Sequence, residues 1–213
     1  TLGALPTAEV AGALEQTARL CRELGHELRE VDAPQVDRAA CADAFFTLAG
    51  AGMDQLMRMM SPLLGREPGP DELEPFTLAL RARYRALPEG ALARAQRAVA
   101  EAGEQVRGFL SEHDIVLSPT MPFSAPALGS LAPDLPCELL IERTQLLAGY
   151  TALLTFAGAP AMSVPLFESP EGLPIGSQFA ARPGAEGTLL SLAYQLELAR
   201  PWAGRWPAIA IST

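Results

Sequence analysis

The spacing of apolar residues changes near residue 113, and this change constrains the fold more than any other feature of the sequence. Residues 114–118 form a short apolar run that enters a proline-rich segment, as a buried strand does. Before it, apolar residues recur at alternating steps of three and four, which gives a long helix one apolar face: Leu92, Ala95, Val99, Ala102, Val106 and Phe109. Long helices combined with a few short buried strands predict an α/β fold.

The segments on both sides of residue 113 extend this pattern. On the N-terminal side we expect helices over 7–24, 37–64, 71–87 and 89–112, and a short strand over 26–31. On the C-terminal side we expect strands over 114–118, 161–165 and 175–180, and helices over 138–156 and 186–199. Turn residues at 168–172 predict that the last two strands form a β-hairpin. We treat residues 1–213 as a single domain with a helical region, 1–112, and a strand-rich region, 113–213.

The composition excludes several classes of protein. Hydrophobic residues make up 49% of the chain and charged residues 19%, which provides for a folded core and excludes a disordered chain. The net charge is −9, and an acidic chain gains no affinity from phosphate neutralisation, so we expect no nucleic-acid partner. The uncharged stretch 144–167 is interrupted by Gly158, Pro160 and Pro165, so we expect no membrane span.

The cationic side chains are all of one kind. The chain contains no lysine, so its 16 cationic residues are all arginines. A mechanism that needs a lysine base is therefore closed to this chain acting alone. Arg81, Arg83 and Arg85 are alternate residues of one predicted helix, and we expect them on its solvated surface.

The cysteines and the first residues bear on the redox environment. Cys21, Cys41 and Cys137 are too few and too scattered for a disulfide scaffold. The segment that begins at Thr1 has neither the basic nor the apolar region of a secretion signal. We therefore expect a cytoplasmic protein whose cysteines are reduced thiols.

No residue set in the sequence supports a catalytic or metal-binding assignment. His26 and His113 lie far apart without a spaced partner, so we expect no metal site and no cofactor. A triad could be written from Ser118, His113 and Asp114, but neighbours at a helix end and the following strand rarely orient as base and orienting group. The Gly-x-Ser-x-Gly elbow of serine hydrolases is absent.

Two loop segments are candidates for a pocket wall. The strand at 114–118 ends in a proline-fixed turn that contains Thr120, Met121 and Pro122, and ligands of open α/β sheets bind at the carboxyl ends of strands. Residues 155–160 include Thr155 and Gly158, where small residues allow close backbone approach. On physical grounds alone, tight packing of a loop is the favoured explanation of each segment, and a pocket wall is the alternative.

These segments, with those that follow them, resemble the amidase-signature hydrolases. The family commonly ends a strand in Asp-x-x-x-x-Pro-Thr, as at 114–120, and later carries a Gly-x-Pro-Ala pattern before a Ser-Val-Pro strand, as at 158–165. The segments 172–178 and 201–205 continue the resemblance, which covers nearly the whole chain and is strong from Asp114 to Trp202. The tail from Pro165 looks most like the branch that contains 6-aminohexanoate cyclic-dimer hydrolase.

The resemblance implies the C-terminal portion of an amidase-signature fold, with a few mixed strands covered by long helices. The family's chemistry uses a serine nucleophile, a second serine and a lysine, none of which can be placed in this chain, so no catalytic residue is assigned and the chain alone is expected to be inactive. In the full enzyme it would bind a linear or cyclic amide, and the substrate-binding candidates are Thr120, Met121, Pro122, Thr155 and Gly158. The family usually has asparagine where Thr155 stands.

Other interpretations are a fragment of the related amidotransferase A subunit and a non-catalytic remnant that serves as a binding or assembly module. The expected partners are the missing N-terminal half or a second copy of the chain. We expect such contacts at the strand edge 115–117 and at the stripe Leu92, Val99 and Val106, because uncovered strand edges and apolar faces drive association.

Overall fold

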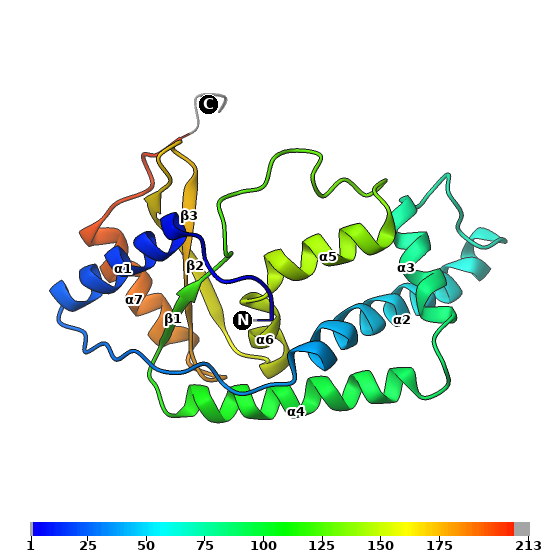
Figure 1. The fold of residues 1–213 in the computed structure, drawn as a ribbon, viewed down its shortest axis with the longest axis horizontal. Coiled ribbons are helices and arrows are strands. Elements are labelled where there is room, and N and C mark those ends of the chain that lie inside the picture. The colour runs from blue at the N-terminus through cyan, green and yellow to red at the C-terminus, as the bar shows by residue number, and fades with distance from the viewer. Residues whose placement is uncertain (1, 207–213) are drawn as a thin grey trace.

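The computed structural model describes residues 2–206 and confirms the α/β class (Figure 1). Its elements follow in the order α1 (Ala8–Glu23), α2 (Arg38–Leu64), α3 (Pro75–Arg85), α4 (Ala91–Ser111), β1 (Val116–Pro119), α5 (Cys137–Ala148), α6 (Thr151–Ala157), β2 (Ala161–Glu168), β3 (Pro174–Ala180) and α7 (Glu186–Ala199). Within residues 2–206, every helix is too short or too polar to cross a membrane.

The three strands form one sheet in the order β1-β3-β2. Both pairings are antiparallel, so β1 and β2 run in the same direction on either side of β3, and the predicted hairpin of β2 and β3 is confirmed. Ala180 pairs with Val116 on one side and with Ala161 on the other. The register of β2 shifts between Val164 and Phe167.

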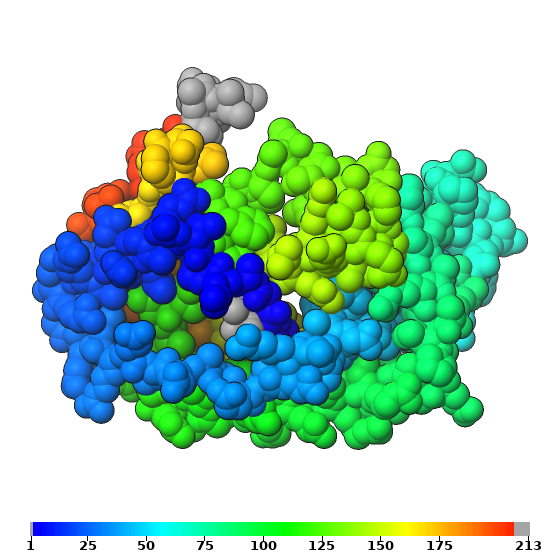
Figure 2. Space-filling model, viewed as in Figure 1, coloured from blue at the N-terminus to red at the C-terminus, as the bar shows by residue number. Residues whose placement is uncertain are grey.

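Helices α1 and α7 cover one face of this sheet (Figure 1). The main core lies between these two helices and the sheet. It includes Leu166, Phe179 and Leu196, which are all at most 2% exposed. The other half of the molecule is helical: α2 packs against α3 and α4, and α4 packs against α6. Space-filling atoms show the N-terminal segment crossing the front of the molecule (Figure 2).

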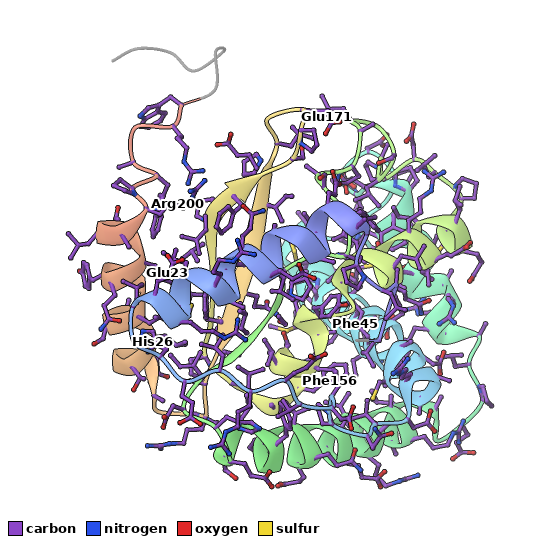
Figure 3. All side chains as sticks on the ribbon, turned by 60° about the vertical axis from the view of Figure 1, so that its left-hand side comes forward. Glu23, His26, Phe45, Phe156, Glu171 and Arg200 are labelled. Atoms are coloured by element: carbon purple, nitrogen blue, oxygen red, sulfur yellow. The ribbon has the colours of Figure 1, made fainter. Side chains whose placement is uncertain are left out.

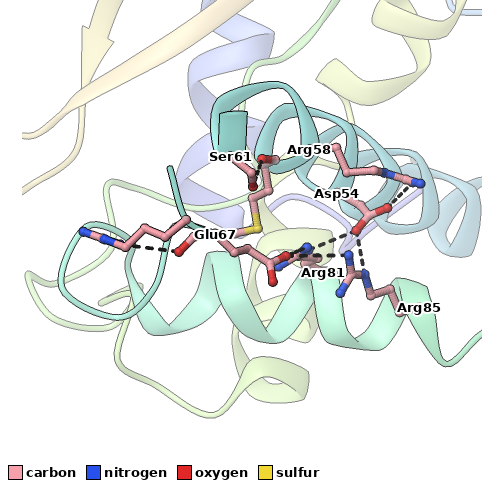
Figure 4. A network of polar contacts seen from close by, with 8 residues as sticks. Asp54, Arg58, Ser61, Glu67, Arg81 and Arg85 are labelled. Carbon is pink, nitrogen blue, oxygen red and sulfur yellow. Dashed lines mark hydrogen bonds and ion pairs between the residues drawn. The ribbon is translucent and has the colours of Figure 1, made fainter. Parts of the chain in front are cut away.

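A buried ion network joins α2 to α3 (Figure 4). One carboxylate oxygen of Asp54 accepts hydrogen bonds from Arg81 Nε at 3.0 Å and Arg85 Nε at 2.7 Å, and the other oxygen pairs with Arg58. Arg81 also pairs with Glu67. Asp54 is 2% exposed because arginine side chains cover it, and their hydrogen bonds, that of Arg81 foremost, lower its pKa.

The expectation that Arg81 lies on a solvated surface is therefore wrong, since it is only 7% exposed. Arg81 and Arg85 are four residues apart and share one face of α3, which alternate spacing alone conceals. Arg83 lies on another side of the helix and forms longer ion pairs, at 3.4 Å, with Asp43 and Glu138.

The C-terminal segment folds back along β2. Arg200, at the end of α7, donates from Nε to the carbonyl oxygen of Leu166 and places its guanidinium 4.3 Å from the ring centre of Phe167 (Figure 3). Arg205 donates to the carbonyl oxygen of Pro165 and pairs with Glu168 at 3.1 Å. Two guanidinium groups thus donate hydrogen bonds to consecutive carbonyl oxygens of β2.

Several predicted elements differ from the observed ones. The strand expected over 26–31 is wrong: this segment crosses the surface between α1 and α2, and within it only Leu28 packs on the core. The helix expected from residue 71 begins at Pro75 instead, because a residue before proline avoids the helical region and Glu74 is extended with ψ 148°. The helix expected over 138–156 is divided at Gly149 into α5 and α6.

The apolar stripe of α4 is partly covered within the molecule, since Val106 is buried and Leu92 and Val99 are half-buried. Val106 is 2% exposed and packs with Leu153 and Ala157 of α6. The interface requires glycine at position 103, because a Cβ there would lie 2.5 Å from the carbonyl oxygen of Phe156. The expectation that Val106 belongs to an open contact face is therefore wrong, whereas association through Leu92 and Val99 stays a prediction.

Candidate functional site

Polar side chains gather on the face of the sheet opposite to α1 and α7. Successive strand residues point to opposite faces. Ser118 of β1 and Thr120, which directly follows β1, therefore share a face with Ser163 of β2 and Gln178 of β3. Thr120 Oγ1 lies 2.6 Å from Ser163 Oγ, and Gln178 Nε2 donates to Ser118 Oγ at 3.1 Å. We call these four residues the hydroxyl row.

Gly176 allows the two flanking strands to bring their hydroxyl groups together. The Thr120 amide donates to the Gly176 carbonyl at 3.1 Å, which extends the β1–β3 ladder by one residue. A Cβ built on Gly176 would lie 2.5 Å from Ser163 Oγ and 2.6 Å from Thr120 Oγ1. The contact between Thr120 and Ser163 therefore depends on the absence of a side chain between them.

The substitution Gly176→Ala tests this dependence. We expect it to separate the two hydroxyl groups and to lower the free energy of unfolding by about 1–2 kcal/mol, the range of a modest overpacking strain. Gly187→Ala is the matched control, since a Cβ at that position would meet no atom within 4 Å and α7 gains a better helix former. Urea denaturation measures both variants. A Gly176→Ala protein as stable as the Gly187→Ala protein would contradict the steric argument.

The opposite face of β3 is closed. Ser177 Oγ lies 2.7 Å from Thr17 Oγ1 of α1, and Thr17 in turn donates to the Ala13 carbonyl at 2.9 Å. Both residues are at most 2% exposed. By contrast Ser163 is exposed and Thr120 is half-buried, so these two are the most accessible members of the hydroxyl row, whereas Gln178 is buried.

The structure places the predicted substrate-binding residues at two ends of this face. Thr120 follows the carboxyl end of β1, and Met121 beside it is half-buried. Pro122 is fully buried, and its carbonyl accepts the Thr7 amide at 2.8 Å. Thr155 is exposed on α6 and Gly158 ends that helix with φ 61°, before the amino end of β2.

Because β1 and β2 run in the same direction, Thr120 and Gly158 lie toward opposite ends of the strands. That the five predicted substrate-binding residues form a single wall of one binding pocket stays a prediction. Ser163 is the functional candidate that the sequence analysis did not assign. The alternation of the Ser-Val-Pro strand places it on the face of Gln178, but only the position of β3 brings it to Thr120.

The histidines do not join the hydroxyl row in the contacts that the structure gives them. His26 Nε2 lies 2.9 Å from Gln195 Oε1 of α7, beyond the end of α1 (Figure 3). The ring of His113 meets that of Phe109 edge to face at 5.0 Å. Ser118 bonds to Gln178 and to the Pro119 carbonyl. Among residues 2–206, no three His, Cys, Asp or Glu side chains gather as a metal site requires.

The three cysteines are free thiols, and burial raises the pKa of each. Cys21 and Cys41 are 4% and 1% exposed, whereas Cys137 at the start of α5 is half-buried. We expect the native protein to react with a thiol reagent first at Cys137, and slowly, because a raised pKa leaves little thiolate at pH 7. Mass spectrometry of partly labelled protein measures the order; a disulfide in unreduced protein, or faster labelling of Cys41, would contradict it.

The comparisons with known proteins decide the family. The family model described as Amidase matches residues 1–190. The chain belongs to the Amidase family. The Mycobacterium tuberculosis protein named "Putative amidase AmiC" is 33% identical over 186 residues, which are 87% of this chain and 39% of that protein. The 6-aminohexanoate-cyclic-dimer hydrolase of a Pseudomonas species is 27% identical over 94% of this chain and 42% of its own length.

Solved structures agree with this assignment. The structure of 6-aminohexanoate cyclic dimer hydrolase with substrate has a TM-score of 0.84 at 27% identity, and the match covers 97% of this chain and 45% of the hydrolase. A bacterial aryl acylamidase, at 18% identity and a TM-score of 0.74, shares the fold. The chain thus spans about two-fifths of the curated relatives it matches and corresponds to their C-terminal portion.

Proposed function

We propose that this chain is the C-terminal part of an amidase that hydrolyses the C–N bond of a linear or cyclic amide. Its role is to supply three strands of the sheet and one wall of the substrate pocket. The TM-score of 0.84 to the cyclic-dimer hydrolase, over 97% of this chain, is the observation that carries the proposal. That hydrolase acts on a cyclic amide by its name, which supports an amide as the substrate class.

The hydroxyl row suits this role. An amide offers a carbonyl oxygen that accepts hydrogen bonds and, unless fully substituted, an N–H group that donates. A serine or threonine hydroxyl can both donate and accept, and its hydrogen rotates to suit the partner. Ser163 and Thr120 present two such hydroxyls 2.6 Å apart on the accessible face of the sheet. The pair can therefore hold one end of an amide group in a fixed orientation.

The hydroxyl row binds an amide in this proposal and does not attack it. A serine or threonine nucleophile needs a base within hydrogen-bond reach. Thr120 and Ser163 bond to each other, and the chain has no lysine to serve as a base. The nucleophilic serine, the second serine and the lysine that the family uses would come from the other part of the family domain.

Two alternatives remain distinct proposals. An amidotransferase A subunit from Thermotoga maritima has a TM-score of 0.64 at 22% identity, which supports the shared fold alone. The higher TM-score and identity of the cyclic-dimer hydrolase favour a hydrolase. A non-catalytic remnant would keep the sheet, but its gene would no longer encode the catalytic serines and lysine.

The test begins with the gene upstream of Thr1. A continuous frame that encodes a Gly-Gly-Ser-Ser motif and a lysine would favour the hydrolase, and a stop codon or frameshift would favour the remnant. In the longer protein, we expect Ser163→Ala to raise KM for an aryl amide about tenfold with a smaller change in kcat, since one hydrogen bond contributes about 1–1.5 kcal/mol. Ser111→Ala, on the exposed surface of α4, is the control. An unchanged KM would remove Ser163 from the pocket wall.

A further inference from the structure

The C-terminal half of α2 carries an apolar face that no other element covers in the described part of the chain. Five residues of this half are exposed at the molecular surface: Leu56 (47%), Met59 (64%), Met60 (39%), Leu63 (84%) and Leu64 (45%). Their spacing of three, four, seven and eight residues from Leu56 places them on one side of the helix. We call this set the α2 apolar face.

Packing within the molecule does not explain this face. Another side of the same helix already anchors it, through Gly50, Asp54 and Met57, which are all buried. A Cβ on Gly50 would lie 2.7 Å from Tyr84 Cβ, so α2 and α3 approach as closely as a glycine allows. Helix α2 thus has two apolar sides and needs only one of them for its own fold.

The five side chains of the α2 apolar face are uncharged, and Arg66, just past the end of the helix, is paired with Glu72. The nearest charged residue of the helix is Arg58, and its guanidinium is turned to the Asp54 carboxylate on the other side (Figure 4). The chain as a whole carries a net charge of −9, so two copies repel each other over most of their surfaces. This face is a place where two copies can approach without like charges between them.

The same observations disfavour a lipid surface. Helices that lie on membranes carry lysine or arginine on the side next to their apolar face, and they gain affinity from anionic lipids. The residues that border the α2 apolar face include Gln55 and Pro62, which are uncharged. An acidic chain whose arginine at the end of this face, Arg66, is already paired with Glu72 gains little from an anionic bilayer, whereas a second copy offers an apolar face of matching size.

We propose that the α2 apolar face pairs with the same face of a second copy about a two-fold axis. The exposed parts of the five side chains amount to roughly 500 Å² per copy if a fully exposed Leu or Met is about 200 Å², and a pair buries roughly 1,000 Å², the lower limit for a specific interface. Such self-pairing makes each residue contact its own counterpart or a near neighbour, as in most two-fold dimers. Neighbouring Met and Leu side chains adapt to one another readily.

Sedimentation velocity of the 213-residue chain, from about 1 to about 100 μM, tests the proposal. We expect a monomer–dimer equilibrium with a dimer of twice the 22.6 kDa chain mass. The double variant Met59→Glu/Leu63→Glu places like charges across the axis, and we expect it to raise the dimer dissociation constant at least about tenfold. Both positions are exposed, so the monomer fold tolerates them; circular dichroism checks this. Leu198→Glu, at an 83% exposed position of α7, is the matched control and should dimerise like the parent.

Cross-linking provides a second measurement that does not depend on affinity. In Leu63→Cys the new thiol lies near the proposed axis, so mild oxidation should give a covalent dimer, whereas Leu198→Cys should give none. A chain that is monomeric at the highest concentration would overturn the proposal. So would a dimer that the double variant leaves intact, or equal cross-linking of both cysteine variants, because each points to another contact surface. The proposal does not depend on amide hydrolysis, so neither result bears on the proposed function.

Discussion

Purified alone, the 213-residue chain should hydrolyse a simple aryl amide no faster than the uncatalysed background. The reason is chemical: no lysine exists in the chain, and arginine cannot replace it as a base because it stays protonated. Loss of a nucleophile and its base typically removes several orders of magnitude in rate. Release of 4-nitroaniline from a 4-nitroanilide, followed at high protein concentration, measures the effect.

Contaminating hydrolases are the main source of a false positive in this assay. A preparation of Ser163→Ala made in parallel serves as the control, because a contaminant would act equally in both. Turnover that survives repurification and disappears in Ser163→Ala or in Ser118→Ala would identify an alternative nucleophile. That result would contradict the prediction that the chain alone is inactive. It would also assign the hydroxyl row a catalytic role in place of a binding one.

The second large effect concerns Asp54. Asp54→Asn keeps the shape of the side chain but removes the charge that holds Arg81 and Arg85 together, and three arginines then repel one another. Breaking a fully buried ion pair costs about 3–5 kcal/mol. Here solvent reaches the outer side of the arginines, since Arg58 and Arg85 are 67% and 50% exposed, so we expect a loss of about 2 kcal/mol. This corresponds to a fall in Tm of roughly 4–8 °C.

The pH dependence of this loss has a definite sign. The arginines lower the pKa of Asp54 below its ordinary value of 3.8, so the folded state holds the ionised form more strongly than the unfolded state does. The stabilisation is complete above that ordinary value and is lost as the pH falls through the lower, folded value. The difference between parent and Asp54→Asn should therefore be constant from about pH 5 to about pH 7 and shrink at lower pH.

Urea denaturation at several pH values measures this difference. Asp43→Asn is the matched control on the same helix, because Asp43 is 65% exposed and its ion pair with Arg83 is longer, at 3.4 Å. An exposed pair of this kind contributes less than about 1 kcal/mol. If Asp43→Asn cost as much as Asp54→Asn, general charge balance, and not the α2–α3 network, would account for the effect.

Local sequence patterns were sufficient for the elements whose stabilisation is local or regularly periodic. Helix α7 has the predicted bounds, Glu186–Ala199, and the turn residues at 168–172 correctly indicated the hairpin. The strand predicted over 26–31 shows the limit. A short apolar–polar alternation forms a strand only where a neighbouring strand offers hydrogen-bond partners, and nothing in the segment itself says whether one is present.

Contacts between distant segments account for the rest. Asp54 meets Arg81 and Arg85 across 27 and 31 residues, and each partner looks like surface when its own helix is considered alone. Thr120 meets Ser163 across 43 residues only because β3 lies between their strands and carries glycine at position 176. The proline-fixed turn indicated the position of Thr120, but its partner depends on the strand order, which local periodicity does not contain.

The two guanidinium groups along β2 decide at which edge of the sheet another strand can pair. A strand that approached β2 from outside would find no donor at Pro165, which lacks an N–H, and the carbonyls of Pro165 and Leu166 already held by Arg205 and Arg200. Charged side chains at an edge are a common means of preventing unwanted strand addition. Pro119 likewise lacks an N–H at the end of β1, but among the contacts of residues 2–206 no arginine side chain binds a carbonyl of β1. Of the two edges of this three-stranded sheet, β2 is therefore the one protected against strand addition, and β1 is the more open one.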